Sequence, residues 1–237
     1  MNMRIKPLIA LINQQSTTVR HFSYKNILTW YSGLVRPKPT KPPHKHIIQV
    51  GDPCLRAISK PVPTKDIETE EVQKLIAYLK HVCRKYDCYG LSAPQVGVPL
   101  RIFIMGLTQK ALDKHFTKKE IAAKALKAIE PLVVINPEMK VTDYTKVVLE
   151  ESCESVKGFC ADVPRYMSVE LKGYDEDGHT FSMNASGFTA RIIQHEMDHL
   201  DAKLYTDIMD KKTLYCPHWQ VVNERCGKVE LPYGPFK

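Results

Sequence analysis

Two histidines four residues apart, with a glutamate directly after the first, are the residues of this sequence best suited to do chemistry. His195, Glu196 and His199 lie in the stretch QHEMDHL. Residues four apart share one face of a helix, so both imidazoles can bind one metal ion. Glu196 can then act as a general base on a water molecule. The pattern is typical of zinc metallopeptidases, and a surface helix that happens to carry two histidines is the alternative.

The third metal ligand decides between a peptidase and another enzyme, because catalytic zinc sites usually have three protein ligands. One peptidase pattern requires a glycine and a third histidine at the positions that Ala202 and Tyr205 occupy here. Another requires a downstream glutamate on a helix, and only Glu224 and Glu230 follow His199, near prolines. A peptidase is therefore weakly supported by the sequence.

Cys153 is the other candidate for the third ligand. It lies among three glutamates in LEESCESVKGF. Neighbouring carboxylates discourage ionisation of a free thiol, whereas a bound metal ion would deprotonate it. A small buried residue is the alternative, and the spacing alone leaves both open.

Charge is unevenly distributed along the 237 residues. Residues 1–50 contain eight Lys and Arg and no acid, whereas the remaining 26 basic residues match the 26 acidic ones. The overall charge of +8 therefore belongs to the N-terminal segment and does not indicate a nucleic-acid-binding body. A basic, acid-free leader is typical of a mitochondrial transit peptide, with a disordered basic tail or a contact to an anionic surface as alternatives. The Pro- and Lys-rich stretch RPKPTKPPHKH that follows predicts a linker.

The remaining composition limits the class of protein. Seven cysteines without a C-x-x-C pair favour a reducing compartment. No run of 18 apolar residues is present, so we expect no transmembrane segment.

Hydrophobic spacing predicts three helices and several strands. The helices are expected from Thr64 to near Gly90, over 118–129 and over 186–200. Strands are expected over 100–107, over 132–137 with a stop at Asn136-Pro137, from 145 onward, and in a hairpin around DEDG at 175–178. Because no βαβ rhythm occurs, we predict an α+β fold of mostly antiparallel sheet packed around a central helix that carries the HExxH residues.

Three ordered motifs resemble those of the peptide deformylase family. They are CYGLSAPQ at 88–95, ESCES at 151–155 and QHEMDHL at 194–200. The leader and the stretches GF at 158–159 and VPR at 163–165 are similar to the mitochondrial branch. The resemblance implies a transit peptide and linker over residues 1–45, and a catalytic domain with a C-terminal extension over residues 46–237.

The resemblance also implies roles for individual residues. The implied metal ligands are Cys153, His195 and His199. They would bind one divalent ion, Fe(II) or Zn(II), with Co or Ni as substitutes. Glu196 would transfer protons, and the Gln95 side chain and Glu154 backbone N–H would stabilise an oxyanion.

A methionine side chain needs an apolar pocket. The positions that the resemblance implies for substrate binding are Gly90, Tyr89, Leu149, Phe188 and Ile192. Core packing is the alternative for the apolar members of this set. Arg191 stands where an apolar residue often lines the family's pocket, so one wall is expected to be polar. Asp198 is expected to pair with Arg165 or to orient a histidine, with a solvated helix acid as the alternative.

Three glycines common in the family are replaced. Cys88, Ser152 and Ala202 occupy their positions. Ser152 is the main concern, since a positive φ next to the ligand cysteine would cost about 1–2 kcal/mol for a residue with a side chain.

These observations favour a metal-dependent deformylase of the mitochondrial matrix. Its substrates would be N-formyl-methionyl peptides and nascent chains, with transient ribosome contact and no sequence-specific nucleic acid. The alternatives are a zinc metallopeptidase and a catalytically weak paralogue that binds N-terminal peptides or the ribosome.

Overall fold

The computed structural model describes residues 41–123 and 126–234. The chain divides into the units Met1–Thr40 and Lys41–Lys237, and all described residues belong to the second unit. Most of the predicted targeting segment, residues 1–40, lies outside the described residues. The predicted boundary between residues 45 and 46 stays a prediction.

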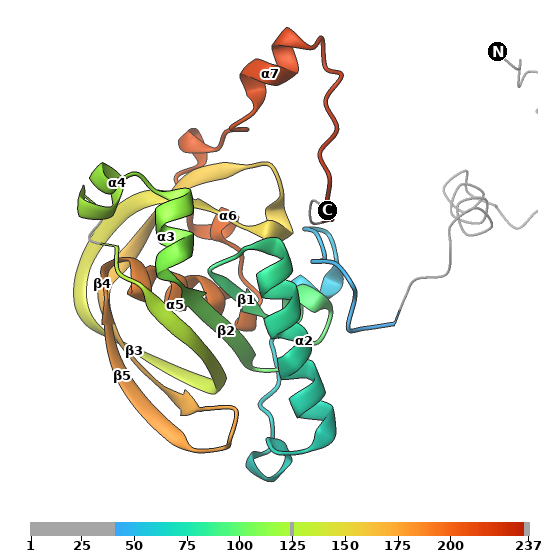
Figure 1. Ribbon diagram of the computed structural model, residues 1–237, viewed down its shortest axis with the longest axis vertical. Coiled ribbons are helices and arrows are strands. Elements are labelled where there is room, and N and C mark those ends of the chain that lie inside the picture. The colour runs from blue at the N-terminus through green and yellow to red at the C-terminus, as the bar shows by residue number, and fades with distance from the viewer. Residues whose placement is uncertain (1–40, 124–125, 235–237) are drawn as a thin grey trace, which may run out of the picture. The chain divides into compact units, whose positions relative to one another are not determined.

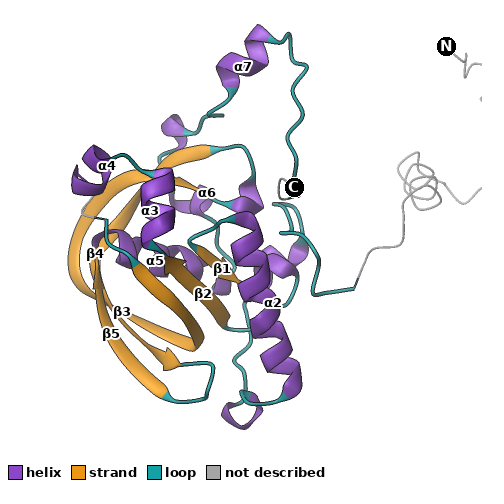
Figure 2. Ribbon diagram, in the orientation of Figure 1, coloured by secondary structure: helices purple, strands orange, loops and turns teal. Residues whose placement is uncertain are grey.

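The described unit combines one antiparallel sheet with short helices (Figures 1 and 2). Its α-helices are α2 (Glu70–Tyr86), α3 (Gln109–His115), α4 (Lys118–Ala123), α5 (Gly187–Leu200), α6 (Tyr205–Ile208) and α7 (Trp219–Glu224). Its strands are β1 (Gly90–Ser92), β2 (Ile102–Leu107), β3 (Ile129–Ser152), β4 (Cys160–Tyr174) and β5 (Thr180–Ser186). Short 3₁₀ turns are η1 (Pro53–Arg56), η2 (Thr64–Asp66), η3 (Ala93–Val96), η4 (Glu154–Val156) and η5 (Lys211–Thr213). Within these residues, no helix has the length and apolar character needed to cross a bilayer.

The strands pair in chain order, β1-β2-β3-β4-β5, and every pair is antiparallel. The predicted α+β class with antiparallel strands is therefore confirmed. The predicted hairpin is also present, because β4 and β5 pair on either side of residues 175–179.

Strand β3 corrects one prediction, since Asn136-Pro137 does not end it. The strand continues to Ser152 through a register irregularity between Ile135 and Glu138. Asn136 takes a positive φ of 50°, and its side-chain amide bonds both the N–H and the carbonyl of Val62, at 2.8 and 2.7 Å. A bulge absorbs the residues that would stop a regular strand.

The predicted helix over 118–129 is also corrected. Helix α4 covers the first part of this range and ends at Ala123, α3 lies before it, and β3 already begins at Ile129. The Thr108 side chain caps α3 by accepting the N–H of Ala111 at 3.2 Å. Helix α2 ends before the predicted Gly90, because Asp87 adopts a left-handed cap with φ of 55°.

Alternating side chains of the central strands build two cores on opposite sides of the sheet. Ile102 and Ile104 of β2 pack in a core with the apolar face of α2. Phe103 and Met105 of the same strand pack in the core that contains α5. Helix α5 contacts all five strands, and Figure 1 shows the sheet curving around it. Helix α5, which carries the HExxH residues, is therefore positioned by contacts with every strand of the sheet.

Candidate active site and metal centre

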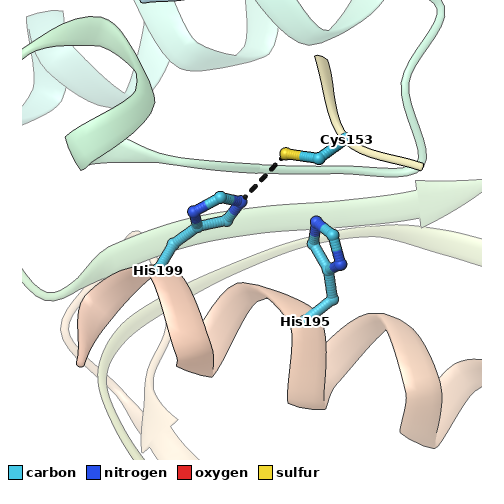
Figure 3. Close-up of side chains that lie close together, drawn as sticks. All are labelled: Cys153, His195 and His199. Carbon is cyan, nitrogen blue, oxygen red and sulfur yellow. Dashed lines mark hydrogen bonds between the residues drawn. The ribbon is translucent and has the colours of Figure 1, made fainter. Parts of the chain in front are cut away.

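Helix α5 presents His195 and His199 on one face, and Cys153 approaches them from the end of β3 (Figure 3). One ligand atom from each residue lies within 4.8 Å of the others, and Cys153 Sγ is 3.3 Å from His199 Nε2. Ligand atoms of a tetrahedral zinc ion with bonds of about 2.0–2.3 Å lie about 3.5 Å apart. One sulfur and two imidazole nitrogens in this arrangement fit a divalent transition metal.

Cys153 sits where β3 gives way to the turn η4. Its sulfur accepts the backbone N–H of Ser155 at 3.4 Å and the side-chain amide of Gln95 at 3.6 Å. Both of these N–H donors are directed at the sulfur atom. The residue is 7% exposed, so this polarity comes from the chain and not from solvent.

The two imidazoles have different surroundings. Burial lowers the pKa of His199 well below its ordinary value, which keeps its ring neutral and able to bind a metal. Burial opposes the charged form of His195 as well, but the neighbouring Cys153 and Glu151 outweigh it and raise its pKa. Glu151 Oε2 lies 3.0 Å from His195 Nδ1, which directs the proton to that nitrogen and leaves the other free for a ligand bond.

Glu196 lies against Gly90, the first residue of β1. Its side chain is buried, and a Cβ atom on Gly90 would lie 2.3 Å from Glu196 Oε1. Among the described residues, the buried Glu196 Oε2 has no hydrogen-bond partner. Burial raises the pKa of Glu196 to about 7, opposed mainly by His195. A carboxylate in this state can exchange a proton near neutral pH.

Gln95 is fixed by the turn η3. Its side-chain oxygen accepts the backbone N–H of Ser92 at 2.9 Å and the Ser92 hydroxyl at 3.1 Å. The amide nitrogen is therefore directed at Cys153 and the Ser155 hydroxyl, 3.2 Å away. Glu154 is the first residue of η4, where backbone N–H groups lack partners within the helix. The two expected oxyanion donors thus flank Cys153.

Glu151 connects the histidine to two buried arginines, a role that the motif did not reveal. Both of its oxygens accept Arg165, at 2.9 Å each, and Oε1 also accepts Arg191 at 2.7 Å. Burial alone would raise the pKa of Glu151, but hydrogen bonds from His195 and Arg165 hold it well below its ordinary value. Arg165 reaches on to Asp198 at 2.5 Å, so the expected Asp198–Arg165 pair is present in the structure.

Arg191 is turned toward the protein and not toward open solvent. It is 4% exposed, and its guanidinium donates to Glu151 and to the carbonyls of Val147, Val163 and Leu149 at 2.6–3.4 Å. Although Arg191 borders the active-site cavity, its donors are engaged by these acceptors. The sequence marked Arg191 only as a basic residue at a position that is often apolar in the family, and it did not indicate the contact with Glu151.

A cavity of about 460 Å³ is lined by Cys153, His195 and Glu196, among other residues. Four of the five expected substrate-binding residues line it: Tyr89, Gly90, Phe188 and Ile192. Leu149 is not among the lining residues. His115 and Phe116, at the end of α3, border the cavity although the sequence gave no reason to place them there.

The backbone conformation at two of the replaced glycine positions differs from the prediction. Ser152 ends β3, paired with Cys160, and is not among the described residues with positive φ. The backbone strain that a positive φ would have caused at Ser152 is therefore absent. Ala202, by contrast, has a φ of 61°. It lies after helix α5, where the N–H groups of Ala202 and Lys203 return to His199 and Asp198 in a Schellman cap.

Known proteins share both this fold and this sequence. A family model described as polypeptide deformylase matches residues 44–214. The chain belongs to the peptide deformylase family. The human mitochondrial peptide deformylase is 41% identical over 186 residues, which cover 78% of this chain and 76% of the human protein. A chloroplastic peptide deformylase 1A of Solanum lycopersicum is 37% identical, covering 87% and 71% of the two chains.

Solved deformylase structures have the same fold. The enzyme from Synechococcus elongatus, in complex with actinonin, superposes with a TM-score of 0.58 at 31% identity, over 74% of this chain and 84% of that one. The Thermotoga maritima enzyme gives 0.59 at 30% identity, over 70% and 98%. The family and enzyme class predicted from three short motifs are thereby confirmed.

Proposed function

We propose that this deformylase hydrolyses the formyl group from the N-terminal formyl-methionine of nascent peptides made in mitochondria. The observation that carries the proposal is the convergence of Cys153, His195 and His199 beside buried Glu196, within a chain of this family. Water adds to the formyl carbon, the C–N bond breaks, and formate and a free α-amino group result.

Cys153, His195 and His199 would hold one divalent ion. A thiolate with two imidazoles suits Zn(II) and also Fe(II), with Co or Ni as substitutes. When bound, the ion would supply Lewis-acid chemistry and make water a stronger nucleophile at neutral pH. The Glu151 carboxylate holds His195 in the tautomer that such binding requires.

Glu196 would take the proton from the attacking water and pass it to the leaving amine. Its raised pKa, about 7, suits a group that must both accept and return a proton. Gly90 leaves room for its carboxylate, because any side chain at that position would overlap Oε1. The absence of a side chain at Gly90 therefore leaves the space that the Glu196 carboxylate occupies.

The Gln95 amide and the Glu154 backbone N–H would stabilise the negative charge that develops on the formyl oxygen. Each such donor contributes about 3 kcal/mol in comparable sites. Gln95 is held by Ser92 in the orientation that presents its nitrogen, so little reorganisation is needed.

Arg165 would act at a distance from the substrate, by joining Asp198 to Glu151 and thereby to His195. Asp198→Asn tests this role. We expect weaker metal retention in a chelator competition, because Asp198 anchors the guanidinium that positions Glu151. Unchanged metal content and turnover would refute it.

We assign the protein to the mitochondrial matrix. Support comes from the acid-free leader and from the similarity to a human protein named as mitochondrial. Nascent chains are then the expected partners, with transient contact to the ribosome. Fusing residues 1–45 to a fluorescent protein tests the targeting, and cytosolic fluorescence would contradict it.

The decisive experiment supplies anaerobically purified, Fe(II)-loaded protein with formyl-Met-Ala-Ser and measures formate. We expect turnover that Cys153→Ala abolishes together with metal binding. Cys160→Ala is the matched control, since this half-buried cysteine lies outside the ligand cluster. A metal-loaded wild type that releases no formate would refute the proposal. Metal retained by Cys153→Ala would favour the peptidase alternative.

A further inference from the structure

The segment between β2 and β3 contributes an aromatic wall to the active-site cavity. We propose that Phe116, at the end of α3, contacts the side chain of the substrate's first residue and determines which side chains are accepted. The proposal rests on the deformylase function proposed above, and it names a residue outside the three motifs.

The ring geometry supports this assignment. The Phe116 ring lies 5.9 Å from Tyr89 and 6.1 Å from Phe188, measured between centroids, and Tyr89 lies 6.1 Å from Phe188. All three rings border the cavity that Cys153 and His195 also line. Tyr89 comes from the first motif, and Phe188 lies on α5, the helix that also carries the third motif. Phe116 therefore adds a third ring to a wall that these two residues begin.

The segment is anchored so that this wall has a fixed position. Its core residues Leu112 and Leu126 are buried with Leu107 of β2, and Phe116, Tyr89 and Phe188 pack against this cluster. Packing of Phe116 on this cluster and on the rings of Tyr89 and Phe188 therefore joins the segment to the pocket.

Polar contacts fix the end of α3 as well. Asp87 accepts Lys114 Nζ and lies 2.8 Å from His115 Nε2. Asp87 lies two residues before Tyr89, in the stretch that continues through β1 to Gln95 in η3. The end of α3 is thus tied to the loop that must face the substrate, which argues against a loosely attached insertion.

The chemistry of the wall suits an unbranched thioether. Sulfur packs favourably at the edges of aromatic rings, and a flexible chain can follow a ring surface. Removing the Phe116 ring would both weaken such contacts and open space for a larger side chain. A change of selectivity, and not only of rate, is therefore the signature of the proposed contact.

The test compares kcat/KM for formyl-Met-Ala-Ser, formyl-norleucine-Ala-Ser and formyl-Phe-Ala-Ser. For Phe116→Ala we expect the preference for Met over Phe to fall about tenfold. Phe116→Leu, which keeps more of the packing, should lower the preference for Met over norleucine about twofold to fivefold. Phe181→Leu is the control, because Phe181 is also half-buried on the core but does not border the cavity.

Equal changes for all three peptides would overturn the proposal and leave Phe116 a packing residue. A selectivity change that follows only the second residue of formyl-Met-X-Ser would also overturn it. Binding of the product Met-Ala-Ser, measured by calorimetry, gives a readout independent of turnover. We expect Phe116→Ala to weaken it relative to Phe-Ala-Ser, and an unchanged ratio would count against the contact. Wild-type protein that releases no formate would instead refute the proposed function.

Discussion

Gly90 lies so close to the Glu196 carboxylate that a side chain at position 90 would overlap it. Replacing this glycine by alanine tests whether the position of the Glu196 carboxylate matters to catalysis. The added Cβ would lie 2.3 Å from Oε1, 2.9 Å from Cδ and 3.0 Å from Cγ of Glu196. Ordinary contacts of a Cβ begin at 3.4 Å. Glu196 is buried and packed, so its carboxylate must move by about 1 Å to relieve the overlap.

A displacement of this size would move Glu196 away from the position in which we propose that it acts as the base. Misplacement by about 1 Å costs on the order of 100-fold in rate, or about 2.7 kcal/mol of transition-state stabilisation. We expect Gly90→Ala to lower kcat for formyl-Met-Ala-Ser about 100-fold. The metal content should stay near one ion per chain, because the change does not touch Cys153, His195 or His199.

The assay is formate release under anaerobic conditions, with metal content and thermal unfolding measured on the same preparations. Gly234→Ala is the matched control, since a Cβ at Gly234 meets open space. A Gly90→Ala enzyme with kcat within about threefold of wild type would refute the reasoning. It would mean that Glu196 tolerates displacement and does not act as the positioned base.

Two further changes test the frame around the site. Ala202→Gly should raise the free energy of unfolding by about 1 kcal/mol, because it relieves a left-handed residue in the cap after α5. The melting temperature should rise by about 2–4 °C, with kcat unchanged, and a lower melting temperature would contradict the assigned strain. Glu151→Gln should weaken metal binding about 10–100-fold in a chelator competition. It should also cost about 3 kcal/mol in denaturant unfolding, since Arg165 and Arg191 would lose their shared buried anion; unaltered values in both measurements would exclude that role.

The sequence predicted those features that depend on local order. Helix α5 was predicted over 186–200 and runs from Gly187 to Leu200, because its apolar residues recur at helical spacing. The β4–β5 hairpin was predicted from DEDG between alternating stretches. The two elements predicted less well contain features that only tertiary contacts settle. Asn136 is held in β3 by Val62, far away in the sequence, and the segment of α3 and α4 takes its form from packing on Tyr89 and Phe188.

The prediction of local strain failed for a related reason. A glycine in a family motif indicates only that a side chain is rare there, and it does not say whether φ or crowding is the cause. Ser152 takes the place of such a glycine within an extended strand, whereas Ala202 takes the place of one in a left-handed cap. Both replacements look alike in the sequence, and only the backbone separates them.

Sequence separation also decides which contacts of the site could be predicted. His195 and His199 share a helix face, so their convergence follows from spacing alone. Cys153 is 46 residues from His199, and only its place in a motif suggested that they meet. Glu151 joins Arg165, Arg191 and His195 from 14 to 44 residues away, and three charged groups with no common pattern gave no signal. The motifs therefore predicted which residues converge, whereas the contacts of Glu151 with Arg165, Arg191 and His195 became visible only when β3, β4 and α5 were brought together.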